Sequence, residues 1–106
     1  MIDHITPSDF VERRKAGEDL LLLDVREPRE LAIASVPGAV HIPMAQVPAR
    51  LGELDAGKHI VVICHSGGRS QAVAGFLKHQ GFEKVSNLAG GITRWSREVD
   101  PSIPVY

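Results

Sequence analysis

Seven consecutive residues of the chain combine a nucleophile with groups that bind anions. They read Cys64-His65-Ser66-Gly67-Gly68-Arg69-Ser70, and Cys64 is the only cysteine. The thiolate is the nucleophilic form of cysteine, and nearby backbone amides, cations and helix N-termini lower the pKa of a thiol. We therefore expect Cys64 to be the reactive group and the other six residues to form the loop that binds its substrate.

The rest of the loop would surround the sulfur with hydrogen-bond donors. The dipeptide Gly67-Gly68 can adopt positive φ angles, which turn successive N–H groups into a concave anion nest. A helical pattern begins near Arg69, so the free N–H groups of its first turn and the Arg69 cation add to that field. In His65-Ser66 we expect the backbone amides to matter more than the side chains. Ser70 either donates a hydrogen bond to the sulfur or is only a helix-start hydroxyl.

Cysteine phosphatases offer a second interpretation, because they also place a cysteine after a strand and an arginine at a helix start. Their loops resemble one another in a C-x5-R spacing that wraps a tetrahedral phosphate, whereas Cys64 and Arg69 have the spacing C-x4-R. A tighter ring of amides suits one sulfur atom better than three phosphate oxygens. The sequence also has no obvious general-acid aspartate loop, so a phosphate or arsenate enzyme is the less favoured hypothesis.

The segments on either side of the loop predict the elements that hold it. Ile60-Val61-Val62-Ile63 is an unbroken β-branched run, typical of a buried strand, and residues 71–80 carry a helical pattern that ends at Gly81. Further strands are predicted at 20–25, 40–42 and 85–88, and further helices at 7–16, 28–34, 48–54 and 92–99. This alternation predicts one α/β domain over residues 1–106, with a mainly parallel sheet and its ligand site at the carboxyl ends of the strands.

Two charged residues, Asp24 and Arg26, lie at the end of the strand predicted at 20–25 and would reach the same edge of the sheet. For Asp24 a scaffold role is the better interpretation. Arg26 either lines the mouth of the site or forms a scaffold ion pair with Glu30. The sequence has no dense cluster of His and Cys, which argues against a structural zinc site, and we expect no metal.

Four motifs resemble those of the rhodanese family and occur in the family's order. Residues 64–70 resemble the active-site loop, 24–27 the first motif, 36–43 the second, and 88–92 with Trp95 the closing turn and helix. Family members often carry Gly-His where this chain has Ala34-Ser35. The resemblance covers almost the whole chain. It implies a single-domain rhodanese with a three-layer α/β fold, in which helices flank a central, mainly parallel sheet of about five strands.

The resemblance also implies an activity. Rhodaneses move sulfane sulfur from a donor such as thiosulfate to a nucleophilic acceptor, through a persulfide on the loop cysteine, here Cys64. The acceptor is cyanide in an assay, and a thiol or a sulfur-carrier protein in a cell; no metal or organic cofactor is implied. The alternative is a non-catalytic module that binds or relays sulfur and depends on a partner protein.

The overall composition indicates which partners and which cellular compartment this chemistry would involve. The formal net charge is −1 and 24% of the residues are charged, which gives no sign of a nucleic-acid or membrane-surface footprint. The apolar runs are far too short to cross a membrane. A single cysteine forms no intrachain disulfide and suits a reducing compartment, and the first residues carry no leader-like pattern. We expect a cytoplasmic enzyme.

Overall fold

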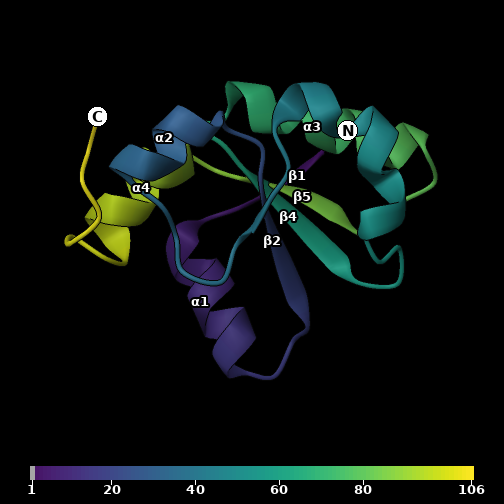
Figure 1. The fold of residues 1–106 in the computed structure, drawn as a ribbon. Helices are drawn as coiled ribbons and strands as arrows, with labels where there is room; N and C mark the ends of the chain where they lie inside the picture. The colour runs from purple at the N-terminus through teal and green to yellow at the C-terminus, as the bar shows by residue number, and fades with distance from the viewer. Residues whose placement is uncertain (1) are drawn as a thin grey trace.

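The computed structural model describes residues 2–106, in which strands and helices alternate (Figure 1). The strands are β1 (Asp3–Ile5), β2 (Leu20–Asp24), β3 (Val40–His41), β4 (His59–Ile63) and β5 (Val85–Leu88). The α-helices are α1 (Pro7–Lys15), α2 (Pro28–Ile33), α3 (Gly68–His79) and α4 (Gly91–Glu98), and two 3-10 helices are η1 (Met44–Gln46) and η2 (Pro48–Glu53).

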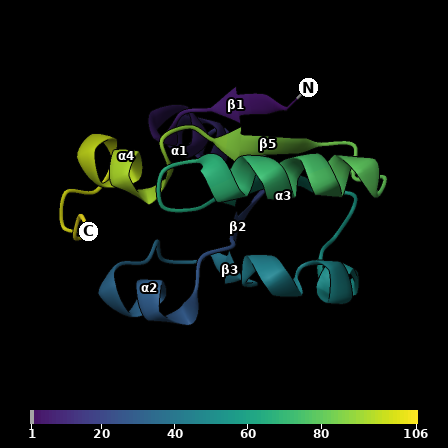
Figure 2. The same ribbon diagram turned by 90° about the horizontal axis from the view of Figure 1, so that it is seen from above.

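The five strands form one sheet in the order β1-β5-β4-β2-β3, and every neighbouring pair is parallel. Viewed from above, α3 lies along β5, while α2 and α4 lie toward the same end of the molecule (Figure 2). The predicted α/β architecture with a parallel sheet flanked by helices is confirmed. Because β4 is the middle strand, its carboxyl end delivers Cys64 to the centre of the sheet edge, where parallel sheets bind ligands.

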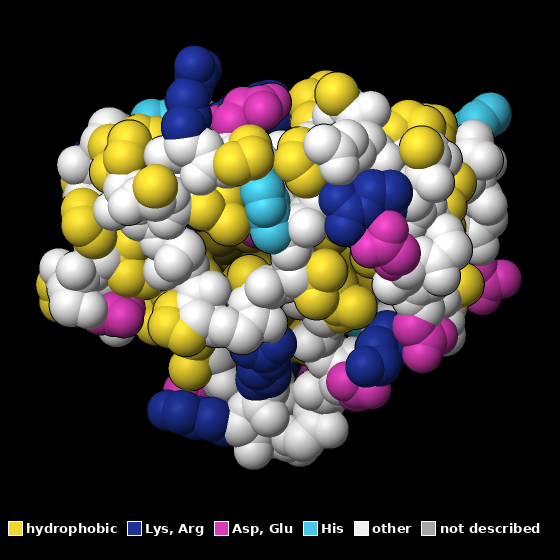
Figure 3. All heavy atoms as spheres, in the orientation of Figure 1, with side chains coloured by type: hydrophobic (Ala, Val, Ile, Leu, Met, Phe, Trp, Pro, Cys, Tyr) yellow, Lys and Arg dark blue, Asp and Glu magenta, His cyan; other side chains and the backbone are white. Residues whose placement is uncertain are grey.

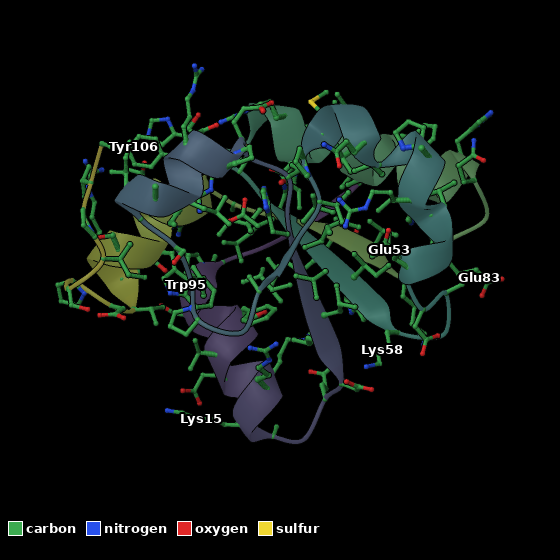
Figure 4. All side chains as sticks on the ribbon, viewed as in Figure 1. Lys15, Glu53, Lys58, Glu83, Trp95 and Tyr106 are labelled. Carbon is green, nitrogen blue, oxygen red and sulfur yellow. The ribbon has the colours of Figure 1, made fainter. Side chains whose placement is uncertain are left out.

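Strand β4 is buried on both faces, which explains its unbroken apolar sequence. Ile60 and Val62 pack in the cluster that contains α3, while Val61 and Ile63 pack in the cluster that contains α1 and α4. In the second cluster the rings of Phe10 and Trp95 meet edge to face, with centroids 5.4 Å apart; Trp95 is labelled in Figure 4. Packing on both sides fixes the backbone from which the cysteine loop departs.

Local signals explain most of the element boundaries. Thr6 caps α1 by accepting a hydrogen bond from the amide of Asp9 at 3.1 Å, and Glu27 and Glu30 form a capping box at the start of α2. The weak helical stretch predicted at 48–54 is present as the 3-10 helix η2. Strand β1 was not predicted. Its three residues are too few to show a pattern, and its pairing with β5 creates it.

The surface mixes charges of both signs. On the face drawn in Figure 3, basic and acidic side chains are interspersed rather than gathered by sign. Within residues 2–106, no helix combines the length and the apolar character that crossing a membrane requires.

Candidate active site

Cys64 directly follows β4, and the chain then turns sharply into α3. Gly67 makes this turn with φ of +118°, a conformation that other residues rarely adopt, and it is the N-cap of α3. The Cys64 residue is only 1% exposed. Its Sγ accepts hydrogen bonds from the Gly67 amide at 3.1 Å and from the Ser70 hydroxyl at 3.3 Å. Gly68, which was predicted to share the positive φ, instead begins the helix.

The surroundings of the sulfur lower the pKa of the Cys64 thiol. Burial raises this pKa, but hydrogen bonds from the Ser70 hydroxyl and from the amides of Ser70, Gly67 and Ser66 outweigh it. All of these donors are uncharged. The loop is therefore a nest of neutral dipoles that favours a thiolate and would equally suit the anionic end of a persulfide.

The start of α4 packs against the backbone of the cysteine loop and donates hydrogen bonds to it. The amide of Ile92 donates to the Cys64 carbonyl at 2.9 Å, and the amide of Thr93 donates to the His65 carbonyl at 3.3 Å. This approach requires Gly91, because a Cβ there would collide with the backbone oxygens of both Cys64 and His65. The Gly90-Gly91 pair, which the sequence suggested was a turn, therefore also fixes the backbone of the cysteine.

The Arg69 side chain is held by Glu30 from α2 rather than left as a free cation. Its Nη1 and Nη2 donate to the two Glu30 carboxylate oxygens at 2.6 and 2.9 Å. This contact holds the pKa of the Glu30 carboxyl well below its usual range, and it raises the pKa of the Arg69 guanidinium. The cation that the sequence assigned to the sulfur is thus largely neutralised, and the pKa of Cys64 depends mainly on neutral donors.

Arg26 does not line the mouth, and its expected ion pair with Glu30 is wrong. The side chain is 0% exposed, and its Nη2 donates to Asp24 Oδ2 at 2.7 Å and to the Ala34 carbonyl at 2.8 Å. Asp24 is the carboxylate partner because it lies two residues away on the same strand end and can receive the guanidinium edge-on. Asp24 has the scaffold role that the sequence favoured.

Tyr106 completes the rim of the site, although no sequence pattern pointed to it. Its hydroxyl donates to Glu30 Oε2 at 2.6 Å and accepts from Arg26 Nη1 at 3.0 Å. Its ring stacks on His65 with centroids 4.0 Å apart, and Figure 4 shows Tyr106 beside α2. The His65 side chain therefore takes part in the rim, beyond its backbone amide.

A cavity of about 500 Å³ opens at this rim, beside the cysteine loop. Its lining residues are Arg29, Glu30, Ile33, His65, Arg69 and Tyr106. Within residues 2–106, no group of three or more His, Cys, Asp or Glu side chains is placed to hold a metal ion.

The sequence and the fold of this chain both match those of known proteins. The family model described as a rhodanese-like domain matches residues 6–98. This chain belongs to the rhodanese family. The predicted resemblance to the rhodanese family is thereby confirmed.

Relatives in other organisms agree with this assignment. A protein named sulfurtransferase from Allochromatium vinosum is 36% identical over 103 residues, covering 97% of this rhodanese and 96% of the relative. The crystal structure of a rhodanese-related protein from Thermoplasma volcanium superposes with a TM-score of 0.84 at 32% identity, covering 98% of this chain and 99% of that one. An NAD-dependent persulfide reductase from A. fulgidus matches with a TM-score of 0.72 at 36% identity, but 89% of this chain covers only 16% of that larger protein.

Proposed function

We propose that this rhodanese is an enzyme that transfers sulfane sulfur through a persulfide on Cys64. The observation that carries the proposal is the pair of neutral donors on Sγ, the Gly67 amide and the Ser70 hydroxyl, which lower the pKa of a buried thiol. A buried cysteine without such donors would have a raised pKa and would be inert.

The proposed cycle has two displacement steps. The Cys64 thiolate attacks the outer sulfur of thiosulfate, the S–S bond of the donor breaks, and sulfite leaves with the electron pair. The amides of the loop then hold the anionic terminal sulfur of the persulfide. An acceptor nucleophile attacks this terminal sulfur, the new S–S bond breaks, and its electron pair returns to Sγ as thiolate. In each step the nucleophile supplies the electron pair of the new bond and the leaving group takes the pair of the broken S–S bond, so the cycle needs no metal or organic cofactor.

The rim supports small anionic donors and suggests where they enter. Arg29 lines the cavity without a carboxylate of its own among residues 2–106, whereas Arg69 shares the Glu30 carboxylate. A donor anion reaching the loop would pass between these two arginines. The single cysteine favours a reducing compartment, and we place the reaction in the cytoplasm, where thiols are available as acceptors.

The proposal is tested by thiocyanate production from thiosulfate and cyanide. Wild-type protein is expected to turn over, and Cys64→Ser is expected to lose at least about 1,000-fold in kcat/KM, because an alcohol does not replace the thiolate nucleophile. A Cys64→Ser protein that is folded and retains full activity would contradict the proposal. Hydrolysis of p-nitrophenyl phosphate by the wild type would instead favour the phosphatase interpretation.

The second candidate is a relay module that passes sulfur only to a partner protein. It is favoured by the match to one segment of the A. fulgidus persulfide reductase, in which a rhodanese-like part lies within a much longer chain. This candidate predicts that Cys64 takes up sulfur from thiosulfate while turnover with cyanide stays negligible. Uptake measured by mass together with turnover measured by thiocyanate separates the two candidates.

A further inference from the structure

Asn87 lies behind the cysteine loop, on β5, and nothing in the loop motif refers to it. The residue is 3% exposed. Its Oδ1 is 2.5 Å from the Ser70 hydroxyl oxygen, and its Nδ2 donates to the Gly67 carbonyl at 3.3 Å. Asn87 therefore contacts two loop residues that also donate to the sulfur, while the amide itself makes no contact with Sγ.

The Ser70 hydroxyl has one proton and three acceptors within reach. Its oxygen lies 2.5 Å from Asn87 Oδ1, 3.2 Å from the Gly67 carbonyl oxygen and 3.3 Å from Cys64 Sγ. A hydroxyl donates one hydrogen bond at a time, so these acceptors compete. While Sγ is neutral, as in a thiol or a persulfide, the short contact to Asn87 Oδ1 is the stronger one. When Sγ becomes a thiolate, a charge-assisted bond to sulfur is stronger than a neutral one.

We propose that Asn87 is a positioning residue that holds the Ser70 proton while Cys64 Sγ is neutral and yields it when Sγ becomes charged. The role rests on the proposed sulfur transfer, and it acts in the release step. As the acceptor takes the terminal sulfur, the electron pair of the breaking S–S bond moves to Sγ. The Ser70 O–H then rotates from Asn87 Oδ1 to Sγ and stabilises the leaving thiolate, with no proton leaving Ser70.

This competition also tunes the nucleophile. Because the hydrogen bond from Ser70 to Asn87 must break before Ser70 donates to the sulfur, Asn87 offsets part of the stabilisation that Ser70 gives the Cys64 thiolate and so keeps that thiolate more basic. A more basic thiolate is intrinsically more nucleophilic, so the loop retains reactivity toward the donor while still favouring the anion.

The ionisable side chains nearest to this cluster come from β1, α2 and α3. His4 from β1 contacts Asn87 Nδ2 through Nδ1 at 3.4 Å, and Arg69 from α3 is paired with Glu30 from α2. A His4→Gln background removes the imidazole that contacts Asn87, and it replaces no residue of the loop.

The test is a double-mutant cycle read out by the ultraviolet absorbance of the thiolate as pH is varied. Ser70→Ala is expected to raise the titration midpoint of Cys64, because a donor is lost. Asn87→Ala is expected to lower it, so that alkylation by iodoacetamide at a pH one unit below the wild-type midpoint is about threefold faster. In the Ser70→Ala background, Asn87→Ala is expected to change nothing, because its effect passes through the missing hydroxyl.

The proposal would be overturned if Asn87→Ala shifted the titration midpoint of Cys64 equally in the wild-type and the Ser70→Ala backgrounds. It would also be overturned if Asn87→Ala raised that midpoint. Asn87→Leu, which fills the volume of the amide without an acceptor, gives the same comparison if the alanine variant does not fold. The titration needs no sulfur donor or acceptor, so a protein that fails to transfer sulfur can still confirm or refute the role of Asn87.

Discussion

Two arginine–carboxylate pairs flank the cysteine loop, with nearly equal contact lengths but very different burial. Arg26 and Asp24 meet at 2.7 Å with side chains 0% and 1% exposed, whereas Arg69 and Glu30 meet at 2.6 Å with side chains 35% and 12% exposed. Losing one partner of a fully buried pair leaves a charge without water, whereas a pair whose cation is partly exposed is screened by solvent and rearranges at a lower cost. The contact distance alone therefore does not show whether an ion pair is essential to the fold or can rearrange, and the exposed fraction of its side chains must be considered as well.

The largest expected effect comes from breaking the buried pair. Arg26→Met is expected to lower the free energy of unfolding by about 3–5 kcal/mol, because Asp24 stays buried without its cation. Urea denaturation followed by circular dichroism measures this change. A loss in the free energy of unfolding below about 1 kcal/mol, which is typical of an exposed pair, would contradict the difference that we infer between the two pairs.

Removing the carboxylate of the outer pair is expected to have a smaller, pH-dependent effect. Glu30→Gln is expected to cost about 1–3 kcal/mol at neutral pH, since Glu30 accepts from Arg69 and Tyr106. The folded protein lowers the pKa of Glu30 below its unfolded value of 4.5, so the stabilisation is complete above that pH and is lost as pH falls below it.

Unfolding curves of both proteins at several pH values check this prediction. The difference in stability between the wild type and Glu30→Gln is expected to shrink steadily as the solution is acidified below the unfolded pKa. A difference that grows on acidification would contradict the assigned sign.

The Tyr106 hydroxyl, which contacts both ion pairs, is expected to contribute less to the free energy of unfolding than Glu30 does. Tyr106→Phe removes the donor to Glu30 and the acceptor for Arg26 but keeps the ring stacked on His65. We expect a loss of about 0.5–1.5 kcal/mol in urea denaturation. A loss equal to that of Arg26→Met would show that the two pairs act as one unit.

The smallest expected change in stability follows removal of the outer cation. Arg69→Ala is expected to cost about 0–1 kcal/mol, because the guanidinium is about one-third exposed. The variant is nevertheless expected to raise the KM for thiosulfate several-fold, since the Glu30 carboxylate at the rim loses its Arg69 partner and would repel an anionic donor. An unchanged KM together with a large loss of stability would reverse the roles given to the two arginines.

The sequence predicted the parts of this architecture that depend on local patterns. The β-branched run before Cys64, the Gly67 turn and the helix after it each carry a signal within a few residues, and all three are present. The pairing of Arg69 with Glu30 spans 39 residues, and the contact of Ser70 with Asn87 spans 17. Such contacts arise from the sheet order and from the way the helices pack, which one sequence does not encode in any short segment.

The same limit explains why the role of Arg26 stayed open in the sequence. Its charge and its position at a strand end were compatible with the mouth or with a scaffold ion pair to Glu30. The fold packs Tyr106 and the α2 segment over it, its exposure falls to 0%, and its ion-pair partner is Asp24. Gly91 was noticed only as part of a turn. Its close approach to the Cys64 and His65 carbonyls became visible once α4 was placed against the loop.

The intact mass of the purified protein after incubation with thiosulfate tests the central claim most directly. The claim is that neutral donors around Cys64 hold a transferable sulfur. We predict a gain of one sulfur atom in the wild type, which cyanide removes, and no gain in Cys64→Ser. A folded wild-type protein that gains no sulfur, or a Cys64→Ser protein that gains it equally, would contradict the account.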